Sequence, residues 1–460
     1  MELENMSKST YILNQLQINY QSVLKGQKIE LDIQESNRFS KPITNNQNEK
    51  SQNSDNYCHK FLSISKILNK EQLNDYIFIE AIKNIQNQTG KVKVIGKISK
   101  AMKLKPYYFQ QYTQIKISDQ IQNENSCYLE DKSGRIKLQL TNSKLCLPNK
   151  TWKEIRIDDL IAGILVLIEG QIVGNNIVNV ENIYLPDYID PPIYTPLNQT
   201  SYVCFISGLN YDVQNDLTKL RHLIQFLQGN LYCGQGNEIS QNLSQIIIAG
   251  NLYGRQGDKK GCLTGSIKKE QDFKDLYSSI QENVRGVDEL INELSSICPI
   301  AIMPGQNEPV SQMFPQAPLQ RAHFGESFEI NTKVTFLTNP TEFSMGNIKF
   351  LGTSGQNIED IKKYSTIKQQ LDIDLIEMTL FYGHIAPTLQ DTLISQLQFK
   401  NDPFIIQQFP NIYFVGNMKK FGTKRISENL RIISIPSFLE TNTISLLNLR
   451  TFECFSLEIK

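Results

Sequence analysis

The sequence predicts a mixed, α+β fold in which a small β-barrel precedes a larger α/β domain built on two sheets. Two observations predict this division. Between residues 91 and 190 the apolar residues recur with a period of two, as in short, half-buried strands. After residue 200, continuous apolar runs alternate with stretches of helical periodicity, which is typical of strands buried beneath helices on both faces.

Composition and charge narrow the possible functions. The chain has 460 residues, with 47 Lys and Arg against 47 Asp and Glu, so its formal net charge is zero. A neutral chain does not gain its main affinity by neutralising a phosphate backbone, although a local basic patch is compatible with it. No apolar run approaches the roughly 18 residues that a membrane span needs. The eight cysteines form no C-x-x-C pair, which argues against a zinc ribbon or an iron–sulfur cluster.

The N-terminal part is weakly patterned. We expect residues 1–57 to be a partly flexible segment, because 33–57 is a polar tract whose burial cannot offset the entropy of ordering it. Residues 58–90 place apolar side chains mostly at helical intervals, which predicts a helical segment leading into the barrel. The first residues show neither the basic start nor the apolar run of a secretory signal, so we expect an intracellular protein.

We expect the barrel over residues 91–190. Six short runs of strand-like pattern are separated by Gly and Asn turns, which is typical of a Greek-key barrel of the oligonucleotide/oligosaccharide-binding (OB) type. The runs are 92–98, 112–117, 127–129, 136–140, 164–168 and 177–180. A proline-rich stretch, 186–196, predicts the junction with the next domain.

The α/β domain is expected over residues 200–460. Three continuous apolar runs, at 202–206, 245–249 and 299–303, predict buried strands, and each ends in a Gly-containing loop. Helical stretches reach to 231 and cover 267–297. Later runs alternate more strictly and predict a second sheet; they are 334–337, 348–351, 412–415, 432–435 and 444–459.

The loops after these strands are the candidate site, because ligands of open α/β sheets bind beyond the carboxyl ends of the strands. Their order resembles the calcineurin-like metallophosphoesterases, whose loops supply Asp, His and Asn ligands to two metal ions. The corresponding positions here are Ser207 and Leu209 in the first loop, Asn251 in the second, Asn307 in the third and Asn417 in the last. Carboxylates and imidazoles are missing from them. We therefore predict a degenerate site with no catalytic residue, no metal and no cofactor.

One histidine stands near this pattern. His384 falls where that family places a His between the third and last loops. We expect it to brace its loop by a hydrogen bond rather than to bind metal, because no carboxylate partner is evident in the sequence. Glu308 and Asp360 are likewise expected to be loop or cap residues.

Further motifs make a resemblance specific. The turn Leu-Glu-Asp-Lys-Ser-Gly-Arg at 129–135 and the run Leu-Gly-Thr-Ser-Gly-Gln-Asn at 351–357 resemble the B-subunits of eukaryotic replicative DNA polymerases. Other matching segments follow in the same order, at 315–319, 338–340, 388–393, 402–404 and 413–417. Within that family the set is most similar to the small, second subunits of DNA polymerase delta, from about residue 58 to the C-terminus.

The resemblance implies an OB-type barrel joined to an inactivated phosphoesterase domain, and a non-catalytic scaffold role in nuclear DNA replication and repair synthesis. It implies that the partners are the DNA polymerase delta catalytic subunit, contacted through its C-terminal metal-binding domain, and a third polymerase delta subunit. It implies that the sliding clamp is engaged indirectly and DNA only weakly or indirectly. It implies neither a cofactor nor a membrane.

Two alternatives stay open. An active metal-dependent phosphoesterase or nuclease is disfavoured, because at least four ligand positions are lost together. A single-stranded DNA-binding module would use aromatic and basic side chains, and the barrel sequence offers one such cluster in Lys103, Lys105, Tyr107 and Tyr108. Because aromatic residues also serve protein contacts readily, we expect this cluster to be an interface or core feature.

Overall fold

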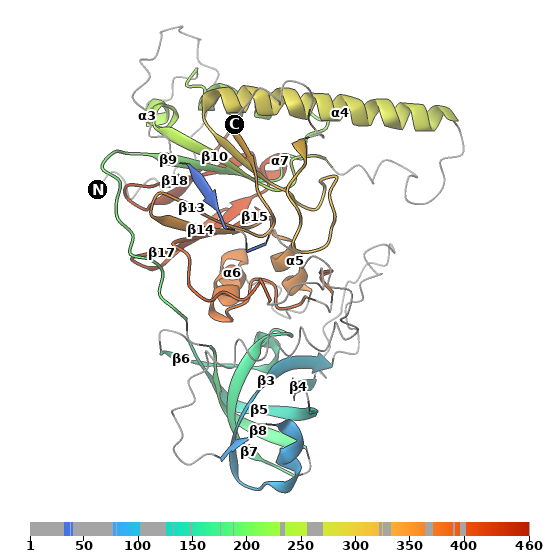
Figure 1. Ribbon diagram of the computed structural model, residues 1–460, viewed down its shortest axis with the longest axis vertical. Coiled ribbons are helices and arrows are strands. Elements are labelled where there is room, and N and C mark those ends of the chain that lie inside the picture. Colours follow the sequence, from blue (N-terminus) through green and yellow to red (C-terminus); the bar gives the residue numbers. More distant parts are fainter. Residues whose placement is uncertain are drawn as a thin grey trace, which may run out of the picture. The chain divides into compact units, whose positions relative to one another are not determined.

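In the computed structural model the polypeptide falls into two units (Figure 1). One unit joins residues 1–40, 192–356 and 410–460, and the other joins 41–191 with 357–409, so the chain crosses between them more than once. The structure describes residues 32–36, 38–39, 77–79, 81–101, 126–131, 133–147, 150–174, 176–186, 188–230, 235–254, 270–321, 324, 333–363, 371–389, 392–395 and 402–459.

The second unit contains a closed β-barrel. Its strands pair in the order β3-β4-β5-β8-β7, and β7 pairs again with β3, which closes the ring. With the outlying β2 and β6, the strands are β2 (Ile77–Ile79), β3 (Lys91–Ala101), β4 (Ser126–Glu130), β5 (Arg135–Cys146), β6 (Trp152–Glu154), β7 (Leu165–Ile172) and β8 (Ile177–Tyr184). Alternate residues point inward, and Val92, Ile98 and Leu129 are fully buried. The predicted barrel is therefore confirmed.

The segment that leads into the barrel differs from the prediction. Residues 77–79 form strand β2, which pairs parallel with the start of β3, and only η2 (Ile82–Asn87), a 3-10 helix, is helical among the described residues of 58–90. The two isoleucines of β2 are spaced by two, and the free edge of β3 supplies their backbone partners. The predicted strand at 112–117 lies outside the described residues.

Described residues within 357–409 contact the barrel, although we predicted that this stretch belongs to the α/β domain. They include most of α5 (Gln356–Lys362) and all of α6 (Asp372–Phe381). Ile405 packs in one apolar cluster with Ile95 and Leu165, on the outer side of β3 and β7. Just after α6, the Tyr382 hydroxyl donates a hydrogen bond to the carbonyl of Asp159 at 3.2 Å. A stretch distant in sequence therefore covers one face of the barrel.

The first unit contains two six-stranded sheets. One has the order β12-β11-β10-β9-β18-β19 and the other β1-β13-β14-β15-β17-β16. The strands are β1 (Ile33–Glu35), β9 (Tyr202–Ile206), β10 (Leu243–Ala249), β11 (Ile300–Met303), β12 (Val334–Phe336), β13 (Thr341–Met345), β14 (Ile348–Thr353), β15 (Ile412–Met418), β16 (Gly422–Ser427), β17 (Leu430–Pro436), β18 (Thr443–Asn448) and β19 (Cys454–Glu458).

Two apolar cores explain the continuous apolar runs. Phe205 and Ile247 point from the first sheet into a core shared with Phe350 and Phe414 of the second sheet. The alternate residues of the same strands, such as Ile206, point into a second core beneath the helices. These helices are α2 (Thr218–Leu227), α3 (Gln235–Gln241), α4 (Glu270–Ile297) and α7 (Phe438–Thr441). The predicted fold class, a barrel followed by a two-sheet α/β domain, is confirmed. Within the described residues, no helix combines the length and apolarity of a membrane span.

The division of the later strands differs from the prediction. Of the five runs assigned to a second sheet, only those of β14, β15 and β17 lie there, whereas β12, β18 and β19 extend the first sheet. Pairing of β18 with β9 joins residues about 240 positions apart, which local pattern does not reveal. Strand β16 escaped prediction because its sequence, Gly-Thr-Lys-Arg-Ile-Ser, is polar and lies at an exposed edge.

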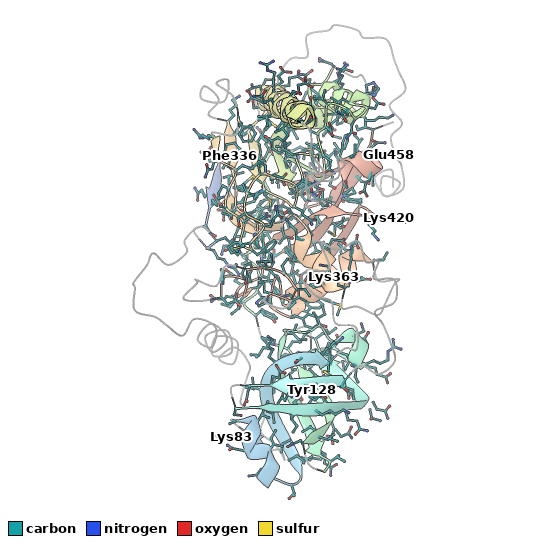
Figure 2. The ribbon with its side chains drawn as sticks, turned by 90° about the vertical axis from the view of Figure 1, so that its right-hand side faces the viewer. Lys83, Tyr128, Phe336, Lys363, Lys420 and Glu458 are labelled. Carbon is teal, nitrogen blue, oxygen red and sulfur yellow. The ribbon has the colours of Figure 1, made fainter. Side chains whose placement is uncertain are left out.

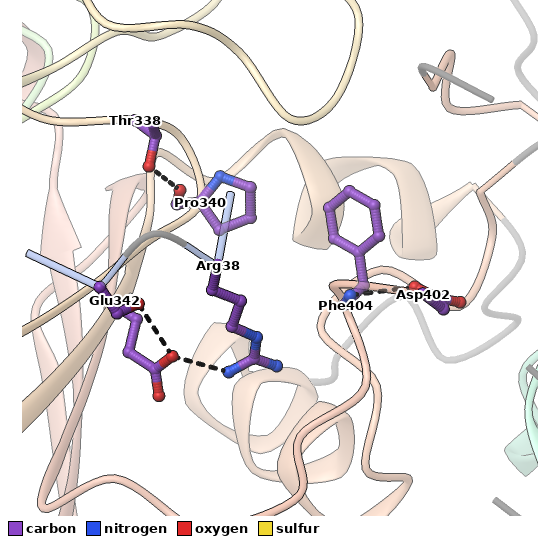
Figure 3. Close-up of polar contacts among 7 residues, drawn as sticks. Arg38, Thr338, Pro340, Glu342, Asp402 and Phe404 are labelled. Carbon is purple, nitrogen blue, oxygen red and sulfur yellow. Dashed lines mark hydrogen bonds and ion pairs between the residues drawn. The ribbon is translucent and has the colours of Figure 1, made fainter. Parts of the chain in front are cut away.

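Part of the tract expected to be flexible is a strand. Residues 33–35 form β1 and pair antiparallel with β13. Beyond the strand, Arg38 Nη1 lies 3.2 Å from Glu342 Oε2 of β13, and the Thr338 hydroxyl nearby donates to the carbonyl of Pro340 at 2.6 Å (Figure 3). The free edge of β13 supplies backbone hydrogen-bond partners to β1, and the amino-acid composition of residues 33–57 gives no sign of this pairing. Residues 40–57 lie outside the described residues.

Candidate functional site at the strand ends

Four loops converge at the carboxyl ends of the central strands of the first unit. They follow β9, β10 and β11 and include the end of β15, and we call them the strand-end cluster (207–211, 250–254, 304–308 and 416–418). Backbone hydrogen bonds link the first two loops, since Gly208 N donates to the Gly250 carbonyl at 3.0 Å. The five positions of this unit that we predicted to correspond to phosphoesterase ligands (Ser207, Leu209, Asn251, Asn307 and Asn417) all lie in the cluster.

The first loop is tied to the second sheet. The Ser207 hydroxyl donates to the Pro436 carbonyl at 3.0 Å and accepts from the backbone N–H of Asn417 at 2.8 Å. Leu209 is only 4% exposed and packs in the core beneath the helices. One of these two side chains is therefore committed to joining loops, and the other points into the hydrophobic core.

The second and third loops are held together by amides. Asn251 Oδ1 accepts hydrogen bonds from the backbone N–H groups of Gln306 at 2.8 Å and Asn307 at 3.4 Å. Asn307 in turn donates from Nδ2 to Asn210 Oδ1 at 2.8 Å. The side-chain amides of Asn210, Asn251 and Asn307 therefore hydrogen-bond to one another or to the loop backbone.

Backbone conformation explains why asparagine occupies two of these positions. Asn251 and Asn417 have φ angles of 55° and 57°, in the left-handed region that asparagine tolerates better than other residues with a Cβ. The Asn417 amide also donates to the carbonyls of Ser354 at 2.8 Å and Ala249 at 3.2 Å. Asparagine at these positions thus both shapes a turn and joins separate strands.

Three glycines of the cluster lie so close to neighbouring loops that a side chain at any of them would clash. A Cβ placed on Gly250 would lie 2.4 Å from the Cβ of Ser354, and one on Gly305 would lie 2.4 Å from Asn251 Oδ1. A Cβ on Gly416 would lie 2.2 Å from the carbonyl oxygen of Ala249. Glycine is therefore required at all three positions by close packing of the loops.

The cluster does not fit a two-metal centre. Such a centre needs carboxylate and imidazole ligands around ions about 3.5–4 Å apart. The five positions provide instead a hydroxyl, an apolar chain and three amides. Each of the four polar side chains makes at least one hydrogen bond to the protein, whereas Asn417 Oδ1 is buried without a hydrogen-bond partner. Over the part of the chain that the structure describes, no three His, Cys, Asp or Glu side chains come together as a metal site.

Glu308 carries a carboxylate within the cluster. Its Oε2 accepts from the backbone N–H of Gly305 at 2.6 Å, and its Oε1 accepts from that of Leu252. Burial raises the pKa of Glu308 to about 7, and the hydrogen bonds from backbone N–H groups oppose that rise. The side chain joins the second and third loops and is 3% exposed.

His384 and Asp360 lie in the other unit. His384 Nδ1 accepts from the backbone N–H of Ala386 at 3.1 Å, so the ring proton lies on Nε2, which is 3.0 Å from Asp402 Oδ2. The expectation that His384 has no carboxylate partner is therefore wrong, because Asp402 lies only 18 positions further along the chain. Asp402 also accepts from the N–H of Phe404 at 2.9 Å (Figure 3).

Asp360 is a buried carboxylate at the C-terminal part of α5. Its Oδ2 accepts from the hydroxyls of Thr388 at 2.5 Å and Thr392 at 2.6 Å, and Lys363 Nζ lies 2.9 Å from Oδ1. It thus joins the helix to the segment at 388–392. Because its partners are hydroxyls and an ammonium group, both carboxylate oxygens are engaged in holding the fold.

Comparisons with known proteins match both units. The model for the DNA polymerase delta subunit OB-fold domain matches residues 41–183, and that for the DNA polymerase alpha/epsilon B-subunit matches residues 203–423. The DNA polymerase delta small subunit of Arabidopsis thaliana is 31% identical over 379 residues, which are 79% of this chain and 81% of that protein. The chain belongs to the DNA polymerase delta small-subunit family.

Other members of the small-subunit family align similarly. The rice protein is 30% identical over 377 residues, covering 79% of this chain and 82% of its own length. The Saccharomyces cerevisiae protein is 29% identical over 375 residues, covering 72% and 69%. Among solved structures, a dimetal phosphatase from Danio rerio aligns with a TM-score of 0.25 and 9% identity over 58% of this chain and the whole of that chain.

The motifs that mark the small-subunit family meet in a buried polar network. Asn339 Nδ2 donates to Gln316 Oε1 at 2.6 Å and contacts the Ser354 hydroxyl, which donates to the carbonyl of Pro304 at 2.9 Å. Gln316 and Asn339 are at most 1% exposed. In the sequence these motifs carry the family resemblance, and the amide and hydroxyl side chains that they share are the signal that could have indicated a polar network.

The motif at 129–135 also has a structural role. Asp131 Oδ1 accepts from the backbone N–H groups of Ser133 at 2.6 Å and Gly134 at 2.9 Å, while Oδ2 accepts from that of Ile82 at 2.7 Å. The carboxylate therefore holds both the turn and the start of η2, whose Ile82 and Ile85 are buried. The aromatic and basic residues Lys103, Lys105, Tyr107 and Tyr108 lie outside the described residues.

Proposed function

We propose that the chain is a non-catalytic accessory subunit of nuclear DNA polymerase delta. Its place in the small-subunit family supports the assignment to this polymerase. The strand-end cluster supports the absence of catalysis, because the side chains at the five positions are neutral and the polar ones hydrogen-bond mainly to backbone groups of the same unit. The function we assign is therefore binding of other polypeptides in DNA replication and repair synthesis.

The observation that carries this proposal is that two asparagine side chains, Asn251 and Asn417, join separate segments of the cluster by hydrogen bonds. Asn251 joins the second loop to the third, and Asn417 joins the last strand to the carbonyls of Ala249 and Ser354. A metal centre would need both positions to present lone pairs to a shared ion. Here the Asn251 oxygen accepts from protein N–H groups, while the Asn417 nitrogen donates to protein carbonyls. We infer that these loops hold no metal ion that would activate a water for attack on a phosphodiester.

The partners we propose are the catalytic subunit, through its C-terminal metal-binding domain, and a third subunit, with the sliding clamp engaged indirectly. Obligate assemblies of this kind typically bury more than about 2,000 Å² in total. Exposed large apolar side chains support such contacts, and both units have them. They are Trp152, Val173, Ile189, Ile193, Val213, Met313, Leu371 and Leu439.

The test is co-purification of the full chain with the polymerase delta catalytic and third subunits expressed in the same cells. We expect one complex of three chains on size-exclusion chromatography, and we expect depletion of the small subunit to lower the abundance of the catalytic subunit. Asn251→Ala removes the hydrogen bonds that join the second and third loops, so it should weaken assembly only to the extent that it destabilises the folded chain. Failure of the folded chain to associate with either subunit would contradict the proposal, as would Mn²⁺-dependent cleavage of DNA that Asn251→Ala abolishes.

A further inference from the structure

We propose that Thr195 is a phosphorylation site for a proline-directed protein kinase, with ATP as the phosphoryl donor. Thr195 precedes Pro196, and in the 460-residue sequence no other serine or threonine is followed by proline. The residue lies in the first unit, in the segment that starts at residue 192. The inference goes beyond the proposed function, which concerns protein partners and no covalent change to this chain.

Two asparagines hold the start of this segment against the amino ends of strands of the second sheet. Asn411, directly before β15, donates from Nδ2 to the carbonyl of Pro192 at 2.7 Å. Asn429, directly before β17, accepts through Oδ1 from the backbone N–H of Tyr194 at 3.0 Å. Lys420, labelled in Figure 2, follows the carboxyl end of β15 and marks the opposite end of the sheet. The segment is therefore separate from the strand-end cluster.

The side chain of Tyr194 anchors the segment and leaves its neighbours outside. The Tyr194 ring contacts the ring of Phe452, with centroids 4.5 Å apart, and packs against the core shared by the two sheets. By contrast, Ile193 is 79% exposed, and Thr195 and Pro196 are exposed too. The fold therefore presents the Thr195 hydroxyl to solvent beside a backbone that is held in place.

The Thr195 hydroxyl is weakly held. It accepts a hydrogen bond from Asn347 Nδ2 at 3.4 Å, which is longer than the usual range for this type of bond. Asn347 is itself exposed, in the turn directly before β14, so water competes for both groups. A kinase therefore reaches the hydroxyl without breaking a buried interaction.

The backbone around the Thr-Pro pair suits the extended substrate that a kinase cleft binds. Residues 191–197 form neither helix nor strand. Pro196 disfavours the helical region for the residue before it, so Thr195 prefers extended geometry. Prolines at positions 191 and 192 restrict the chain further, which lowers the entropy lost on binding. Because Asn198, three positions after Thr195, is not basic, the fitting enzyme is one that reads the proline alone.

ATP supplies everything that the transfer needs. The Thr195 oxygen forms a bond to the γ-phosphorus of Mg²⁺-bound ATP, the bond from that phosphorus to the β,γ-bridging oxygen breaks, and ADP leaves. The hydroxyl proton passes to the catalytic aspartate of the kinase. The phosphothreonine carries a charge of about −1.5 to −2 at pH 7 and stays solvated at the surface. Asn347 Nδ2 is placed to donate to its oxygens, and the apolar surface at Ile193 becomes anionic.

The test is incubation of the full chain with Mg²⁺, labelled ATP and a purified, active mitogen-activated protein kinase, and in parallel with a purified cyclin-dependent kinase. Both enzymes are proline-directed. We expect one phosphate per chain, located on Thr195 by tandem mass spectrometry, because the sequence has one such dipeptide. Thr195→Ala should abolish the incorporation, and Thr195→Ser should retain it. Pro196→Ala keeps the hydroxyl but should slow the incorporation about tenfold or more, because it leaves an apolar pocket of the kinase partly empty.

Matched controls separate recognition of this site from changes in folding. Thr451→Ala removes an exposed threonine that no proline follows, and should leave the incorporation unchanged. Circular dichroism melts of all variants should coincide with that of the parent chain. The proposal is overturned if neither kinase phosphorylates the folded parent chain, or if Thr195→Ala incorporates as much phosphate as the parent. It is also overturned if only chain pretreated with urea is phosphorylated, because the fold would then hide Thr195.

Discussion

At the scale of single residues, the strand-end cluster depends on where amide and hydroxyl groups donate and accept. Ser207, Asn251 and Asn417 each join two segments that are far apart in sequence. The sequence alone shows that ligands are missing from these positions, because residue identity suffices for that. It does not show what replaced them, because partners such as Pro436 and Ser354 become neighbours only when the sheets assemble.

Glu308 makes a pH dependence measurable at this scale. Its folded pKa of about 7 lies above the unfolded value of 4.5, so the folded chain keeps a proton that the unfolded chain loses between these pH values. The contribution of Glu308 to the free energy of unfolding is therefore fully present below about pH 4.5 and is lost as the pH rises through 7. We expect the unfolding free energy of the parent chain to fall relative to that of Glu308→Gln by up to about 3 kcal/mol across this range.

Urea unfolding of both proteins at about pH 5 and about pH 7.5 measures this difference. The exposed carboxylate of Glu154, on β6, supplies the control, because Glu154→Gln should show no such trend. A difference that instead grew with pH in favour of the parent chain would mean that the backbone N–H groups of Leu252 and Gly305 keep Glu308 ionised. The direction of the trend therefore decides which effect dominates at this carboxylate.

At the scale of elements, we could predict a strand wherever the apolar pattern of its own residues is enough to identify it. Strands β9, β10 and β11 are buried on both faces, and a continuous apolar run is enough to show this. Sheet membership of β12 and β18 was not predictable, because it depends on which free edge accepts each strand.

Contact between distant elements also explains one glycine of the barrel unit. Gly163 has a φ angle of +96°, and a Cβ there would lie 1.9 Å from the carbonyl oxygen of Pro387. Gly163→Ala therefore combines backbone strain with displacement of 386–389. We expect a loss of about 3 kcal/mol or more, and faster amide hydrogen exchange in that segment.

Gly90→Ala is the matched control for that substitution. Gly90 has a similar φ angle of +105°, but nothing lies within 4 Å of a Cβ placed there. It should therefore show only the backbone cost, about 1–2 kcal/mol, with unchanged exchange at 386–389. Equal losses for the two variants would refute a packing role for Gly163.

At the scale of the whole molecule, two units are built from interleaved parts of one chain. The barrel and the two-sheet layers were predictable because each rests on local periodicity. The return of 357–409 to the barrel was not, since its residues follow the first α/β strands in sequence order. The strand-end loops of the first unit are joined by hydrogen bonds of their own side chains and backbone, and the function proposed above assigns binding of partners to the surfaces of the molecule.

The most direct test of that central claim is the metal content of the isolated full chain after equilibration with excess Mn²⁺ and removal of free ion. Elemental analysis by mass spectrometry should find well under one ion per chain, because no ligand set is available at the strand ends. About two ions per chain, the content of a two-metal hydrolytic centre, would contradict the account.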